Sequence, residues 1–210
     1  MSLRRVFVAA IAMSWIVETS AVAQVNEARS TKEGENRTNN QTLGISFLKV
    51  GTEISQTADG YRMLIRAADV NIRQATAEVT VSTRPFVDLP GSFGGKLYLD
   101  GSVPNSLLKD RIRIDSIDVN GLSFVREYWA VYAGMGAWEG VINCYASVNS
   151  KYYVISLDAD LALGKPGEVH AGKKLGAEEL QTHAVGILNN TDSPVIQEFQ
   201  NLVSSFRVNQ

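Results

Sequence analysis

Residues that commonly carry chemistry are scarce in this sequence, which has one cysteine, Cys144, and two histidines, His170 and His183. A single cysteine cannot form an intramolecular disulfide, so a small disulfide-stapled fold is excluded. Neither histidine has another histidine, a cysteine or a carboxylate at a recognised metal-ligand spacing, and we predict no metal site. The chain must therefore rely on an ordinary apolar core, for which 210 residues are sufficient.

The sequence also lacks the clusters and glycine motifs that bind nucleic acids or nucleotide phosphates. Its 20 basic and 22 acidic residues are spread along the chain, so nucleic acid is not an expected partner. No G-x-x-x-x-G-K-[ST] motif occurs, and the dinucleotide pattern that begins at Gly134 and Gly136 fails because Glu139 occupies the third glycine position. We interpret the two glycines as turn residues and predict no cofactor.

Long apolar runs are absent except near the N-terminus, where residues 6–17 are almost entirely apolar. Arg4 and Arg5 precede this run and Ala21-Val22-Ala23 follow it, a pattern typical of a cleaved secretory signal peptide. We expect residues 1–23 to be removed and the mature protein to be periplasmic or secreted, with no transmembrane segment. The paired arginines fit both the general and the twin-arginine export routes, and the sequence leaves that choice open.

After the signal peptide, the sequence predicts a polar leader and one folded domain. Residues 24–43 contain almost no large apolar side chains, so burial cannot offset the entropy that ordering them would cost. We therefore expect this leader to be disordered. Residues 44–210 fit a single domain of typical size.

Strand patterns fill most of the predicted domain. Asn120-Gly121 is a two-residue hairpin signal, because a type I′ turn needs two residues that tolerate positive φ. Residues 122–161 predict a three-stranded meander with bends at residues 134–136 and at Asn149-Ser150. Within it, Cys144 shares a strand face with apolar or small residues and is interpreted as a buried hydrophobe. A nucleophile paired with a distant histidine is the alternative.

Two helices are predicted at the C-terminal end. Residues 177–188 carry apolar side chains at helical spacing, and a second apolar stripe follows Pro194, with Asp192 or Ser193 as the cap. Strands first and helices last indicate an α+β domain, in which C-terminal helices pack on one face of an antiparallel sheet.

Two carboxylates on the meander are the main candidates for chemistry. Asp158 and Asp160 are two residues apart on a predicted strand, so both side chains lie on one face. Together with Glu139 or a histidine they would serve a small hydrolase-like or metal-dependent enzyme. A solvated strand end is the simpler interpretation, since two acids do not complete a calcium shell, and we assign no catalytic residue.

The meander is also rich in aromatic side chains. Because neighbouring strand residues point to opposite faces, one sheet-helix core cannot enclose all of these rings. Packing in a core is the alternative interpretation for each ring. We predict a candidate contact surface for a ligand or partner, formed by Tyr128, Trp129, Tyr132, Trp138 and Tyr152.

Four short stretches resemble the Mog1/PsbP-like fold family, which includes PsbP-related proteins and bacterial DcrB-type exported proteins. They are Asn120-Gly121, Arg126 to Tyr128, Asn149 to Val154 and Ser205 to Val208. The N-terminal half departs from the family pattern, since its usual early helix is not found.

The family resemblance implies an α+β fold and a non-enzymatic accessory, assembly or binding protein without a common active site. We therefore expect an exported protein that binds a protein partner or small ligand in the cell envelope. The alternative is a small periplasmic hydrolase-like or metal-dependent enzyme that uses the carboxylates of the meander.

Overall fold

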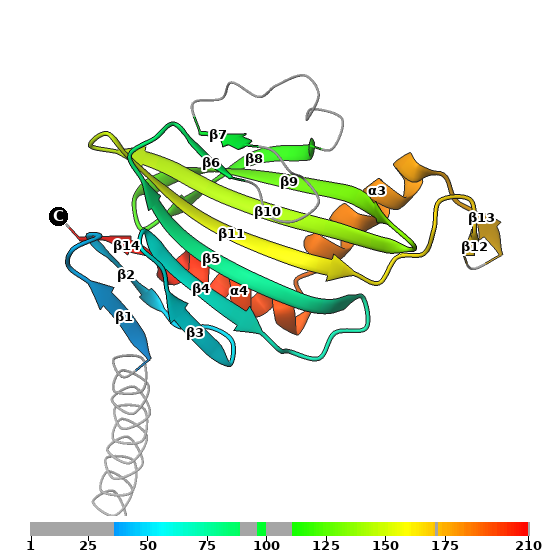
Figure 1. Cartoon of the computed structure of the whole chain (residues 1–210), viewed down its shortest axis with the longest axis horizontal. Helices are drawn as coiled ribbons and strands as arrows, with labels where there is room; N and C mark the ends of the chain where they lie inside the picture. Colours follow the sequence, from blue (N-terminus) through cyan, green and yellow to red (C-terminus); the bar gives the residue numbers. More distant parts are fainter. Residues whose placement is uncertain (1–35, 89–95, 100–110, 171, 210) are drawn as a thin grey trace, which may run out of the picture. The chain divides into compact units, whose positions relative to one another are not determined.

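The computed structural model describes residues 36–88, 96–99, 111–170 and 172–209, and the labels below follow Figure 1. The helices are α3 (Ala177–Leu188) and α4 (Pro194–Ser205). The strands are β1 (Arg37–Asn40), β2 (Ile45–Leu48), β3 (Glu53–Gln56), β4 (Gly60–Ile65), β5 (Ile72–Ser82), β6 (Phe86–Asp88), β7 (Lys96–Tyr98), β8 (Arg111–Val119), β9 (Leu122–Gly134), β10 (Ala137–Val148), β11 (Lys151–Leu161), β12 (Val169–His170), β13 (Lys173–Lys174) and β14 (Arg207–Val208).

Seven antiparallel strands form the main sheet, in the order β3-β4-β5-β11-β10-β9-β8 (Figure 1). The turn between β8 and β9 has φ of 51° at Asn120 and 81° at Gly121, as the hairpin signal predicts. The next two turns also have positive φ, at residues 134–136 and at residues 149 and 150. The predicted meander of residues 122–161 is thus confirmed as β9, β10 and β11.

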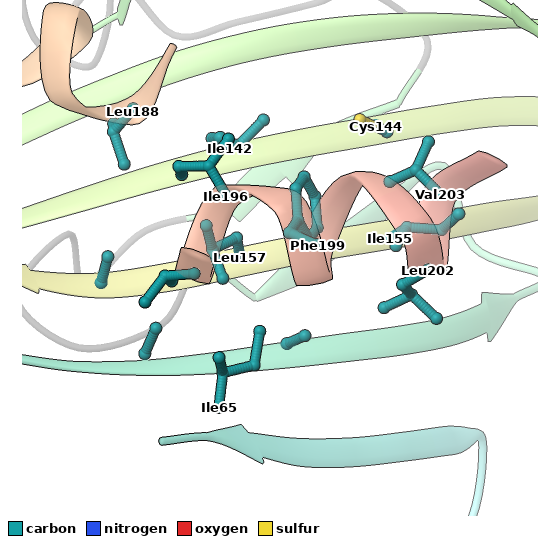
Figure 2. Packing of buried hydrophobic residues seen from close by; sticks show 14 of the residues in the cluster. Ile65, Ile142, Cys144, Ile155, Leu157, Leu188, Ile196, Phe199, Leu202 and Val203 are labelled. Carbon is teal, nitrogen blue, oxygen red and sulfur yellow. The ribbon is translucent and has the colours of Figure 1, made fainter. Parts of the chain in front are cut away.

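Both helices pack on one face of this sheet, which confirms the predicted α+β class (Figure 1). Figure 2 shows Ile196 and Phe199 of α4 in the apolar cluster that also contains Ile142 of β10. The end of α3 approaches β10 closely at Gly140, where an added Cβ would lie 3.0 Å from the Cδ1 atom of Leu188. The Cδ1 atom of Leu161 on β11 is nearer still, at 2.8 Å, so a larger residue at position 140 would require both leucine side chains to shift.

The opposite face of the sheet carries a second, smaller apolar cluster. It contains Trp129 of β9, Val141 and Tyr145 of β10, Val154 of β11, and Leu99 from the segment that follows β7. Tyr128 belongs to the helix-side cluster, so Tyr128 and Trp129 point to opposite faces, as strand alternation predicts. Apolar burial therefore exists on both sides of the central strands.

Regular structure begins earlier than the predicted domain boundary at Gly44. Strand β1 lies inside the segment predicted as a disordered leader, and residues 39–210 form one compact unit. Asn40 donates to the Tyr61 hydroxyl at 2.9 Å and accepts from the Leu43 N–H at 2.9 Å. Hydrogen bonds thus order a segment that offers little apolar surface.

The predicted signal peptide, residues 1–23, and the first part of the predicted leader lie outside the described residues. None of the helices in the described ranges combines the length and the apolar character that a membrane span requires. The export prediction therefore continues to rest on the sequence.

The start of α4 depends on Ser193. Its hydroxyl accepts from the Ile196 N–H and donates to Asp69, and Pro194 occupies the first turn, which confirms the predicted cap. Ser193→Ala should lower the free energy of unfolding by about 1–2 kcal/mol, since a cap and a partner of Asp69 are lost together. Urea denaturation would measure this. Asp192→Ala, at the exposed neighbouring position, is the control and should change stability by less than about 0.5 kcal/mol.

Candidate functional site

A groove of about 200 Å³ lies on the helix side of the sheet, between α4 and strands β8, β9 and β10. Its helix wall is fixed at both ends by residues distant in sequence. Asp69 accepts from Ser193 at the start of α4, and the Asn120 side-chain amide donates to the carbonyls of Ser204 and Phe206 at its end, at 3.1 and 2.7 Å. The groove is thus preformed in the folded chain, as small-ligand sites usually are.

The interior of the groove is mainly apolar. Cys144 lies in its lining, and burial raises the pKa of the thiol to about 12, so at neutral pH the thiol stays protonated. The prediction of a buried, hydrophobic cysteine is confirmed, and the thiol is not activated as a nucleophile. The apolar lining comprises Val119, Ile142, Leu188, Ile196, Phe199 and Val203.

Two arginines and one aspartate lie beside the groove on β8 and β9. Arg126, which lines the groove, donates to both oxygens of Asp115 at 2.7 and 2.9 Å, and Arg113 reaches the same carboxylate at 2.7 Å. The hydrogen bond from Arg126 is the main reason that the pKa of Asp115 is lowered. Since Asp115 is ionised at neutral pH, the trio carries one positive charge in excess.

The aromatic ring of Tyr128 joins this charged trio to the apolar interior. The guanidinium carbons of Arg113 and Arg126 lie 5.3 and 5.4 Å from the ring centre, within the range of cation–π contacts. The Tyr128 hydroxyl donates to the side-chain oxygen of Asn189 at the end of α3, at 3.2 Å. Tyr128 is therefore held in place from both sides.

A second cavity, of about 250 Å³, brings the predicted carboxylates together. Glu139, Asp158 and Asp160 all line it, with Thr76 and Gln74 beside them. Burial, followed by the charge of Glu139, raises the pKa of Asp158 to about 7. This cavity can hold a protonated acid beside a carboxylate near neutral pH, but its described lining contains no histidine, cysteine or serine.

Sequence reasoning missed a buried carboxylate on the face opposite the helices. Glu127 is fully buried, and its oxygens accept from Arg111, Tyr145 and Trp129, each at 3.2 Å. A glutamate placed between Val125 and Trp129 on one strand face was the available signal. Hydrogen bonds from three donors compensate the cost of burying this carboxylate, so we assign Glu127 a role in stabilising the fold.

The residues of the predicted aromatic contact surface differ in exposure. Tyr128, Trp129 and Trp138 are at most 2% exposed and form no exposed patch, although Tyr128 lines the groove and Trp138 lines the second cavity. Trp138 packs in the helix-side core and donates its indole N–H to the Gly164 carbonyl at 2.9 Å. Tyr132 and Tyr152 are half-buried. Contact by these two residues stays a prediction.

Histidine takes no part in either cavity. His183 is exposed on α3, and the side chain of His170 lies outside the described residues. Over residues 36–88, 96–99, 111–170 and 172–209, no group of three or more His, Cys, Asp or Glu side chains is arranged to hold a metal ion. The metal-dependent alternative thus gains no ligand set from this part of the chain.

The solved structures that are similar to this chain include the following two. Cyanobacterial PsbP (CyanoP) from Synechocystis sp. PCC 6803 matches with 12% identity over 82% of this chain and 91% of its own, with a TM-score of 0.31. The Saccharomyces cerevisiae Ran-binding protein Mog1p matches with 11% identity over 82% of this chain and 94% of its own, with a TM-score of 0.37.

Both are Mog1/PsbP-fold proteins. At this level of identity the likeness concerns the fold alone and does not extend to function. No protein-family model and no curated protein matches the chain.

Proposed function

We propose that this protein is an exported, non-enzymatic binding protein that holds the apolar part of a small ligand in the groove between α4 and the sheet. The observation that carries the proposal is the preformed apolar groove of about 200 Å³, whose lining residues Ile142 and Phe199 are only 2% and 3% exposed and so are shielded from bulk water. Apolar pockets with a few polar groups at the rim are the usual form of small-ligand sites.

A small ligand fits the described surface better than a large protein interface does. The large hydrophobic side chains that are exposed in the described part of the chain lie on two strands and in two connecting segments; they are Ile54, Val70, Ile114 and Met135. Ile54 is on β3 and Ile114 is on β8, which are opposite edges of the main sheet. Protein interfaces usually require a contiguous apolar patch.

The export part of the proposal is supported by the signal-peptide pattern of residues 1–23. A buried thiol also suits an oxidising compartment, because Cys144 is shielded from pairing with a cysteine of another protein molecule. The cell envelope or the medium would then supply the ligand.

The enzymatic alternative receives less support. Asp158 and Glu139 share a cavity with Thr76, which supplies a hydroxyl group, but no histidine, cysteine or serine lines its described part. Cys144 belongs to the core cluster on the helix side of the sheet, which Asp158 does not join.

Filling the groove tests the proposed function. Gln200 and Ser204 are exposed on α4 and line the groove, so Gln200→Trp should occupy its opening without disturbing the core. With 1-octanol as the probe, isothermal titration calorimetry should show saturable binding to the wild type and at least about tenfold weaker binding to this variant.

Asn201→Trp is the matched control, because residue 201 is exposed on the same helix and does not line the groove. It should bind octanol as the wild type does. The proposal fails if octanol shows no saturable binding, or if Gln200→Trp and Asn201→Trp bind it equally well.

A further inference from the structure

We infer that the ligand of this groove is an anionic amphiphile, a single short alkyl or acyl chain that ends in a carboxylate. The inference rests on the proposed function and adds the chemistry of the headgroup. It is carried by the position of Arg126, which lines an apolar groove while it shares a single carboxylate with a second arginine.

The charge beside the groove is incompletely neutralised. Asp115 engages the Nε and Nη2 atoms of Arg126 and the Nη2 atom of Arg113, so two guanidinium groups share one negative charge. The other N–H groups of both arginines remain available to an acceptor from outside. Asp115 already fills the Nε and Nη2 fork of Arg126, so an incoming carboxylate would be bound by the Nη1 group of Arg126 and by the Nε and Nη1 groups of Arg113.

The charged trio is accessible to a ligand. The side chains of Arg113, Asp115 and Arg126 are 42%, 24% and 23% exposed, which leaves them partly buried at the groove margin. Charge pairs in such positions are screened less than those on an open surface. The electrostatic attraction on a carboxylate bound there would therefore be stronger than the attraction of a fully exposed arginine.

The acidic residue next to the groove does not compete for the headgroup position. Asp118 lies three residues beyond Asp115 on β8, so strand alternation places the two side chains on opposite faces. The Asp118 carboxylate accepts from the Gly121 N–H at 3.1 Å, in the turn. The headgroup position is therefore defined by Arg126.

The volume of the groove limits the tail. A cavity of about 200 Å³ is smaller than the roughly 300–1,000 Å³ of sites for drug-sized ligands. The apolar lining includes Ile142 and Val203 and offers no charged partner in the interior. One unbranched chain of medium length therefore suits it better than a branched lipid.

Octanoate and 1-octanol separate the headgroup from the tail, because they share the chain length and differ in charge. Titration calorimetry of the full chain should give tighter binding of octanoate, and added sodium chloride should weaken octanoate binding while octanol binding stays constant. Gln200→Trp should weaken the binding of both probes.

Two substitutions that change the net charge beside the groove in opposite directions test the role of that charge. Asp115→Asn removes the shared negative charge and should tighten octanoate binding by about fivefold, whereas Arg113→Gln should weaken it by a similar factor. The readout is the ratio of octanoate affinity to octanol affinity, because a general change in the shape of the groove would affect both probes alike. Glu53→Gln removes an equal charge beside Arg66 at the far edge of the sheet. This variant is the control and should change the binding of neither octanoate nor octanol.

The outcomes distinguish this inference from the proposed function. If octanoate and octanol bind equally, and Asp115→Asn and Arg113→Gln leave octanoate binding unchanged, the anionic headgroup is wrong and an apolar binding protein remains. If neither probe binds, or if Gln200→Trp affects neither, the proposed function fails together with the inference.

Discussion

Glu127→Ala should lower the free energy of unfolding by about 3–5 kcal/mol, the cost typical of breaking a buried ion pair. Glu127 is fully buried and its carboxylate accepts from Arg111, Tyr145 and Trp129. The substitution removes this acceptor from all three donors and leaves the charge of Arg111 without its carboxylate. Most domains have a stability of about 5–15 kcal/mol, so the loss would be a large fraction of the total.

Equilibrium unfolding in urea, followed by tryptophan fluorescence, would measure this effect. Glu78→Ala is the matched control, since Glu78 lies in the same cross-strand row, through Asn143 and Ser156, and pairs with Arg62 at the surface. It should cost about 1 kcal/mol or less. Equal losses for Glu127→Ala and Glu78→Ala would contradict the structural role of the buried carboxylate.

Features that depend on local chemistry were predictable from the sequence. Asn120-Gly121 and the Ser193-Pro194 helix start are recognisable because each residue type suits a specific backbone conformation or hydrogen bond. Strand alternation likewise placed Tyr128 and Trp129 on opposite faces. These rules need only a few neighbouring residues.

Features that depend on distant contacts were not predictable. The pairing of β5 with β11, which joins the N-terminal strands to the meander, is set by the whole sheet. Alternation tells which face a ring occupies, but it does not tell whether that face is covered. Leu99, far from the meander in sequence, belongs to the buried cluster around Trp129, and the sequence pattern of the meander gives no sign of this contact.

The groove also depends on contacts between residues that are distant in the sequence. Its apolar residues are ordinary core residues in the sequence, and only the placement of α4 by Asp69 and Asn120 leaves a space beside them. Arg126 and Asp115 face each other across β8 and β9, which the hairpin register determines. The sequence resemblance indicated these strands through Arg126 to Tyr128, but it did not indicate a cavity.

Asp158→Asn should stabilise the protein above neutral pH and have little effect at acidic pH. Burial and Glu139 raise the pKa of Asp158 from 3.8 to about 7 in the folded chain. Between these two values the folded state binds more protons than the unfolded state, so stability falls as pH rises from about 4 to about 7. Above this range the wild type retains the full cost of a buried carboxylate.

The expected gain of Asp158→Asn at pH 8 is about 2 kcal/mol, after allowance for the solvent screening of a partly exposed group. Urea unfolding at pH 4.5 and at pH 8 would measure it. Glu139→Gln removes the largest charge that opposes ionisation of Asp158, so it should move the fall in stability to lower pH. Asp192→Asn, on an exposed turn, is the control for a change of charge alone. A gain for Asp158→Asn that is the same at both pH values would show that Asp158 does not titrate in this range.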